Sequence, residues 1–164
     1  MLRYAYEYKD QLSKLYVQAM SDPKYKFLRC EGYTDFTISI DDTTWSRHQY
    51  VSVNSKGEVI GYLSASIDNT VPIVSSLYIA NFYERNVTFS KDFYAFLDTL
   101  MTRYSKVSFT VVVGNPAETM YDRVIKKYGG RVVGIKEDHV SIDGALYDFK
   151  MYEILRRNYE AVKD

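Results

Sequence analysis

The stretch KVSFTVVVGNPAETMYDRVIKKYGGRVVG, residues 106–134, decides the fold because it predicts a strand, a helix and a second strand in direct succession. Apolar side chains alternate along residues 107–113 with the period of two that is typical of a strand. Between residues 117 and 128 the apolar positions recur at helical spacing. Gly129 is expected to end this helix in a left-handed conformation, so that a strand begins at Arg131. Helices between strands indicate an α/β fold.

The entry to this helix carries its own signals. Asn115 is expected to be the N-cap, because its side-chain oxygen can accept a hydrogen bond from an N–H group of the first turn. Pro116 would then take the first helical position, where its missing N–H costs nothing. Glu118 would place a carboxylate near the positive end of the helix dipole.

The flanking sequence predicts further elements of both kinds. The expected strands cover residues 2–8, 49–54, 58–68, 72–82, 131–142 and 145–155. The expected helices cover residues 10–20, residues 24–30, and a segment capped by Thr88 or Ser90 that runs to Tyr104. Residues 31–47 follow no period, which suits a binding loop as well as a surface strand with a turn. We therefore expect one domain, residues 1–164, with a mixed sheet flanked by helices.

Composition excludes several classes of function. Lys and Arg total 21, as do Asp and Glu, so the formal net charge is zero and no nucleic-acid partner is expected. The sequence has no signal peptide and no apolar run of membrane-spanning length, which predicts a cytoplasmic protein without a membrane partner. Cys30 is the only cysteine, so the chain has no internal disulfide. His48 and His139 lack the spacing of metal ligands, and no metal site is expected.

Three segments resemble the GNAT family of acyl-CoA-dependent N-acyltransferases, and the resemblance covers about residues 49 to 155. EVIGY, residues 58–62, resembles the family's hairpin strand. RNVTFS, residues 85–90, lies where the family has its pyrophosphate loop, Q/R-x-x-G-x-G/A. Asn115, with a helix and Gly129-Gly130 after it, resembles the family's late Asn–helix–Gly segment. The resemblance implies a mostly antiparallel central sheet of about six to seven strands, acetyl-CoA as acyl donor, and a primary amine as acceptor. GNAT-like proteins are often homodimers.

The resemblance also implies a set of site residues. Tyr121 and Asn115 take the catalytic positions, with Tyr121 assisting the departing thiolate and Asn115 bonding the pantetheine arm. The tetrahedral oxyanion would be held by a backbone N–H near residues 79–81. The cofactor positions are Ile79, Ala80, Asn81, Arg85, Asn86, Val87, Thr88, Phe89, Ser90 and Asn115. Arg123, Lys126, Lys127 and Arg131 could meet the adenosine 3′-phosphate or form a solvated helix face.

Several alternatives stay open from the sequence. Thr88 and Ser90 replace the loop glycines, so their hydroxyls add donors to the phosphates or their Cβ atoms narrow the loop. In the second case the chain is a degenerate scaffold that binds a ligand or protein without catalysis. Tyr121 suits a core aromatic as well as a catalytic role, and Asn115 suits a helix cap alone. The general base has no motif; the candidates are Glu84, His48 and the acidic residues Glu31, Asp35, Asp41 and Asp42, which also favour a cationic acceptor.

Overall fold

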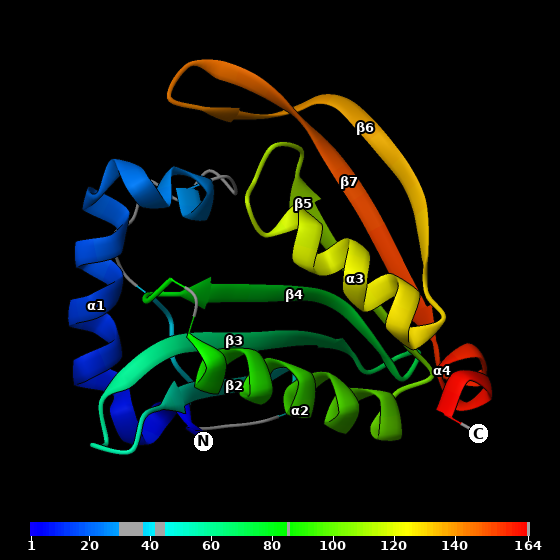
Figure 1. Ribbon diagram of the computed structural model, residues 1–164, viewed down its shortest axis with the longest axis horizontal. Coiled ribbons are helices and arrows are strands. Elements are labelled where there is room, and N and C mark those ends of the chain that lie inside the picture. Colours follow the sequence, from blue (N-terminus) through cyan, green and yellow to red (C-terminus); the bar gives the residue numbers. More distant parts are fainter. Residues whose placement is uncertain (30–37, 42–44, 85, 164) are drawn as a thin grey trace.

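A computed structural model describes residues 1–29, 38–41, 45–84 and 86–163 of the chain. A seven-stranded sheet forms its centre, with the strand order β1-β2-β3-β4-β5-β7-β6 (Figure 1). The strands are β1 (Leu2–Tyr4), β2 (Arg47–Val53), β3 (Val59–Asp68), β4 (Ile73–Asn81), β5 (Lys106–Val112), β6 (Arg131–Ile142) and β7 (Ala145–Leu155). The helices are η1 (Ala5–Tyr8), α1 (Lys9–Ser21), η2 (Pro23–Arg29), α2 (Val87–Arg103), α3 (Glu118–Tyr128) and α4 (Arg156–Lys163). The mixed, mostly antiparallel sheet expected from the sequence is confirmed.

One strand pair breaks the antiparallel pattern. β4 and β5 run parallel, and α2 is the crossover that a parallel connection requires. Both strands lie wholly in the described chain, yet their ladder holds a single register pair, Val74↔Val107. Beyond it the strands diverge, so that the sheet opens like a wedge between β4 and β5 (Figure 1).

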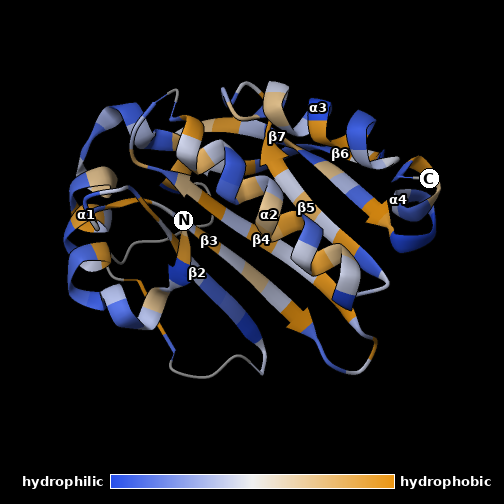
Figure 2. Cartoon of the chain, turned by 60° about the horizontal axis from the view of Figure 1, so that its bottom comes forward, coloured by the Kyte–Doolittle hydropathy of each residue, from blue (hydrophilic) through white to orange (hydrophobic). Residues whose placement is uncertain are grey.

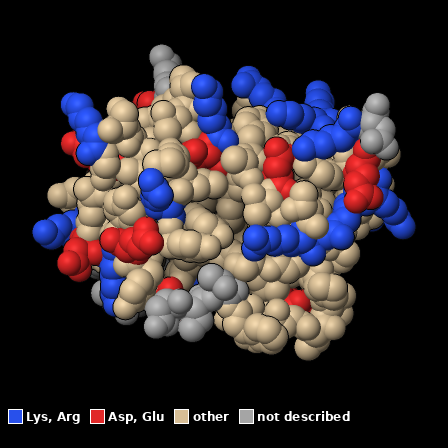
Figure 3. Space-filling view, turned by 90° about the horizontal axis from the view of Figure 1, so that it is seen from below, with Lys and Arg blue, Asp and Glu red and all other residues tan. Residues whose placement is uncertain are grey.

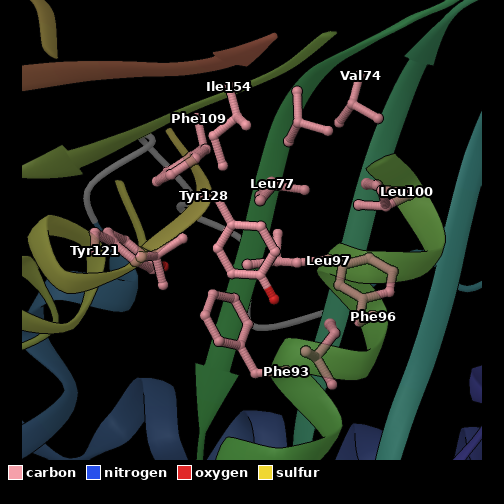
Figure 4. Close-up of a cluster of buried hydrophobic side chains, with 14 of the residues drawn as sticks. Val74, Leu77, Phe93, Phe96, Leu97, Leu100, Phe109, Tyr121, Tyr128 and Ile154 are labelled. Atoms are coloured by element: carbon pink, nitrogen blue, oxygen red, sulfur yellow. The ribbon is translucent and has the colours of Figure 1, made fainter. Parts of the chain in front are cut away.

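The main hydrophobic core lies on the face covered by α2 and α3. The apolar side chains of α2 are buried from Phe89 to Met101, and they belong to one cluster with apolar residues of β3 and β4. Figure 2 shows hydrophobic positions on both α2 and these strands. Across the wedge, Phe109 of β5 stacks on Tyr152 of β7 with ring centroids 5.1 Å apart. Figure 4 shows side chains of β4 and side chains of β5 and β7 meeting in this one cluster. The cluster therefore holds the two halves of the sheet, β1 to β4 and β5 to β7, together where β4 and β5 diverge.

The opposite face has a separate core under α1. Leu12 and Ala19 of α1 are buried with Val51, Tyr62 and Ala80 of three neighbouring strands. This helix covers the part of the sheet formed by β2, β3 and the end of β4, and it leaves the start of β4 without a helix from the described chain. The two faces of the sheet are therefore unequally covered.

η2 lies at the open end of the wedge (Figure 1). The Tyr25 hydroxyl donates a 2.7 Å hydrogen bond to the Phe82 carbonyl just after β4. On the other side, Lys26 Nζ donates to the Tyr147 hydroxyl of β7 at 3.2 Å. η2 thus bridges the two halves of the sheet.

The structure corrects several predicted boundaries near the N-terminus. The strand expected over residues 2–8 ends at Tyr4, because Ala5 is fully buried and begins a 3-10 turn into α1. The helix expected over residues 24–30 is 3-10 in geometry, with a non-helical Tyr25, and residue 30 lies outside the described chain. Most of residues 31–47 also lies outside it, and β2 begins at Arg47.

Three further corrections concern the helices. Asn86 is the N-cap of α2, in place of Thr88 or Ser90. α3 begins at Glu118, two residues after Pro116, because Asn115 forms a turn first. α4 was not expected; it is held by tertiary contacts, since Tyr159 stacks on Tyr128 with ring centroids 5.3 Å apart. The predicted glycine stop is confirmed, because Gly129 has a φ of 65°.

Replacing Gly61 with alanine is expected to destabilise the protein by about 1–3 kcal/mol, as overpacking does in well-packed cores. A Cβ at this position would lie 2.2 Å from the buried Phe89 ring and 2.9 Å from the Ala80 carbonyl oxygen. The measurement is the melting temperature. Gly134→Ala is the matched control, because its Cβ would meet only the flexible end of Met151, at 3.3 Å. Equal losses in the two variants would contradict the close approach at Gly61.

Candidate active site

The wedge between β4 and β5 contains a cavity of about 610 Å³. Its walls come from the end of β4, the first turn of α2, the start of α3 and η2. Six of the predicted site residues line it: Ile79, Asn81, Phe89, Ser90, Asn115 and Tyr121. The structure therefore brings together segments from three separate parts of the sequence, as the predicted site requires.

The other predicted positions are placed differently. The Ala80 side chain is fully buried in the core under α1, so only the backbone of Ala80 is directed toward the neighbouring strands β3 and β5. Asn86 and Thr88 are half-buried at the start of α2, and Val87 is exposed. Arg85 lies outside the described residues.

The first turn of α2 is partly capped by the chain itself. Asn86 Oδ1 accepts a 3.1 Å hydrogen bond from the Phe89 N–H. The Ser90 N–H and hydroxyl both donate to the Asn86 carbonyl oxygen, at 3.1 and 3.2 Å. Within the described chain, the N–H groups of Val87 and Thr88 have no acceptor. The donors left for an anion at this helix end are those two groups and the Thr88 hydroxyl.

Tyr121 joins the core to the cavity wall. Its ring is 7% exposed and packs edge-on to Phe109, with centroids 5.2 Å apart (Figure 4). The same residue lines the 610 Å³ cavity and a smaller one of about 60 Å³ between β4 and β5. Tyr121 is therefore a core aromatic that also lines the cavity.

Asn115 organises the turn that leads into α3. Its Oδ1 accepts a 2.9 Å hydrogen bond from the Ala117 N–H, and its carbonyl oxygen accepts one from the Glu118 N–H. The Glu118 carboxylate reaches back to the Gly114 N–H at 3.1 Å, in the manner of a capping box. These bonds hold Asn115 against the cavity.

The three cavities lie next to one another across the sheet. The 60 Å³ cavity shares Tyr121 and Ile79 with the large one, and it shares Leu77 and Tyr78 with a third cavity of about 210 Å³ on the α1 face. Two ligands could thus approach the divergence point of β4 and β5 from opposite faces of the sheet.

The candidate bases are not equally placed. Glu84 lines the large cavity, where it pairs with Lys24 at 3.2 Å. His48 lines none of the three cavities; it is buried at the far end of α2, where its Nε2 shares a hydrogen bond with the Tyr104 hydroxyl. Asp41 is exposed and lines none of them either, and the other acidic candidates, Glu31, Asp35 and Asp42, lie outside the described residues.

Basic side chains at the cavity come from two elements. Of the four cations considered for a phosphate contact, Arg123 lines the cavity, whereas Arg131 pairs with Glu153 at 2.6 Å. Lys127 lies over the Tyr94 ring, 4.1 Å from its centroid. On the face in Figure 3, basic and acidic side chains are interspersed over uncharged surface. Lys24 of η2 is a further cation at the cavity.

Sequence reasoning missed the contribution of η2. Lys24, Tyr25, Phe27 and Leu28 all line the large cavity. A short helix was expected over residues 24–30, but its place beside the wedge depends on contacts with residues 57 and 121 positions away, which the sequence does not show. The cluster of aromatic and basic residues at 24–29 was the only available signal.

Two further properties concern the described residues alone. They contain no group of three His, Cys, Asp or Glu side chains that could hold a metal ion. None of the described helices is both long enough and apolar enough to cross a membrane.

Comparison with known proteins gives structural matches. No protein-family model matches the sequence, and no curated protein is significantly similar to it. Spermidine N-acetyltransferase from Vibrio cholerae in complex with CoA and spermine has a TM-score of 0.71 at 18% identity, over 98% of this chain and 97% of that one. The spermidine/spermine N-acetyltransferase SpeG of V. cholerae in complex with manganese ions gives 0.64 at 19% identity, over 74% and 72%. The chain therefore has the fold of these N-acetyltransferases, the GNAT fold expected from the sequence.

Acidification is expected to destabilise the protein through His48. Burial and, secondarily, the charge of Arg103 lower the pKa of His48, because protonation would add a charge where its Nδ1 has no partner among the described residues. The unfolded chain binds the proton more readily, so stability falls as pH drops from about 7 to about 5. The melting temperature across this range measures it.

The His48→Gln variant should show a smaller fall over the same range. The His139→Gln variant retains His48 as its one histidine, and it should keep the full dependence of melting temperature on pH. If the melting temperature of His48→Gln falls with pH as steeply as that of the wild type, groups other than His48 cause the acid destabilisation.

Proposed function

We propose that this protein is an acetyl-CoA-dependent N-acetyltransferase that moves an acetyl group to a primary amine. The observation that carries the proposal is the divergence of β4 and β5, with a cavity that combines the start of α2, Asn115 and Tyr121. A structure of the same fold is described with CoA and spermine, which supports a donor of this kind.

The residues at the cavity suit a CoA-type donor. The N–H groups of Val87 and Thr88 and the Thr88 hydroxyl would bind its pyrophosphate at the positive end of α2. Arg123 would meet the remaining phosphate charge, whereas Lys24 would first have to exchange its ion pair with Glu84. Asn115 would contact the pantetheine arm between the two strands. When bound, acetyl-CoA supplies the activated acetyl group as a thioester.

The chain's own groups support acyl transfer at the divergence point. Beyond Val74, the edge of β4 that faces β5 has no ladder partner on β5, although both strands are fully described. Its N–H groups near Ile79 are therefore available to stabilise an oxyanion. The transfer forms an amide N–C bond and breaks the thioester C–S bond. Tyr121 would give its hydroxyl proton to the departing sulfur and recover one from the amine through solvent.

A second function has its own supporting observation. Asn86 Oδ1 already occupies the Phe89 N–H, and Thr88 and Ser90 add Cβ atoms where the family's loop has glycines. These features would weaken binding of a pyrophosphate at α2. The alternative is a degenerate scaffold that binds a ligand or protein in the wedge without catalysis.

Acetyl-CoA is expected to stabilise the protein by about 4 kcal/mol when present at a thousandfold excess over its dissociation constant. The physical reason is mass action, because the cavity exists only in the folded state. A thermal-shift titration measures it, and a comparison of CoA with dephospho-CoA gives the contribution of the 3′-phosphate. A melting temperature that does not respond to millimolar acetyl-CoA would favour the degenerate scaffold.

Tyr121→Phe is expected to lower kcat by about a hundredfold or more, the usual contribution of a positioned proton donor. Acetyl-CoA binding should be retained, because the ring still packs on Phe109. Thiol release with an amine panel and the thermal shift together measure the two effects.

Tyr128→Phe is the matched control on the same helix, since Tyr128 is a buried core tyrosine that stacks on Tyr159 and lines none of the three cavities. Equal activity of Tyr121→Phe and the wild type would remove Tyr121 from the mechanism.

A further inference from the structure

The 210 Å³ cavity on the α1 face differs in chemistry from the donor cleft. Its walls carry the hydroxyls of serine and tyrosine residues together with one guanidinium, that of Arg47. Among the described residues that line it, Arg47 is the only one with a charge, and no carboxylate is present. Arg47 is half-buried and forms no ion pair with a described residue.

The sheet register aligns this cavity with the reaction point. Arg47 on β2 lies opposite Ser66 on β3, and Ser66 lies opposite Ser76 on β4. The three side chains form a row on one face of the sheet. The next residues of β4, Leu77 and Tyr78, line both this cavity and the small cavity between β4 and β5. Arg47 therefore stands two strand spacings, about 10 Å, from the strand where the amine would react.

The positive charge of Arg47, at that distance from β4, would determine which chemical group an acceptor carries at the end opposite its reacting amine. A guanidinium forms paired, charge-assisted hydrogen bonds with a carboxylate, and the flanking Ser64, Ser66 and Ser76 hydroxyls can donate to the same group. A second ammonium group there would meet like charge without a carboxylate from the described lining. The volume of about 210 Å³ suits a small molecule.

We propose that this cavity is the acceptor pocket and that the acceptor is a small amine with a carboxylate at its other end, held by Arg47. The assignment rests on the proposed acetyltransferase function. It differs from the cationic acceptor that the acidic residues of the sequence favoured, and from the spermine named for the V. cholerae structure.

The experiment compares acceptors of equal length that differ only in the far group and are long enough to reach from β4 to Arg47: 5-aminopentanoate, 5-aminopentanamide and 1,5-diaminopentane. Thiol release from acetyl-CoA gives kcat/KM for each, and calorimetry gives their binding to the protein saturated with CoA. We expect 5-aminopentanoate to exceed the other two at least tenfold, through KM. Arg47→Ala should abolish this preference, and Arg47→Glu should reverse it toward the diamine.

Arg3→Ala is the matched control, because Arg3 is an exposed arginine on the edge strand β1 and lines none of the three cavities. It should keep the wild-type preference. The acceptor assignment is overturned if the neutral or dicationic amine is preferred, if Arg47→Ala leaves the preference intact, or if calorimetry detects no carboxylate binding. Turnover with a different preference would leave the acetyltransferase proposal standing, whereas the absence of both a thermal shift and thiol release would overturn that proposal itself.

Discussion

The single parallel strand pair is the constraint on which the rest of the structure depends. Every other neighbouring pair in the sheet is antiparallel and keeps its ladder, whereas β4 and β5 share one register pair before they part. Divergence leaves backbone N–H and C=O groups inside the fold without ladder partners, which is costly unless water or a ligand bonds them. In this sheet the divergence of β4 and β5 leaves a cavity where ladder hydrogen bonds would otherwise lie.

The width of that opening is set from two sides. Below it, Phe109, Tyr121 and Tyr152 pack between the halves and keep them in contact. Above it, η2 bonds Phe82 on one side and Tyr147 on the other, and Arg29 pairs with Asp143 in the β6–β7 turn at 2.9 Å. Single exposed pairs of this kind contribute little each. Their common attachment to one short segment nevertheless fixes both halves relative to each other.

Local sequence signals were sufficient for the scaffold and insufficient for the site. The strands near Val107 and Arg131 and the stop at Gly129 follow from period and backbone preference alone. The start of α3 was placed two residues early, because Asn115 can cap a helix or a turn and only the surrounding contacts choose between them. The residues that the family resemblance pointed to lie in part around one cavity, to which six of them contribute. The role of η2 and the row that ends at Arg47 depend on pairing between distant segments, which no local pattern encodes.

At the start of α2, the free energy contributed by the Asn86 cap can be compared with that of an anion bound at the same N–H groups. An N-cap side chain such as Asn86 contributes about 1 kcal/mol, whereas a hydrogen bond from a backbone donor to a charged group contributes about 1.5–3 kcal/mol. A phosphate that takes the N–H groups of Val87 and Thr88 therefore does not need the Phe89 donor, and it could displace the Asn86 amide at modest cost. Phe89 itself stays in place, because its ring is buried against Gly61 and anchors the helix start to β3. The missing loop glycines thus change how many donors an anion meets at α2, while the position of the helix end, set by Phe89 and Gly61, is independent of them.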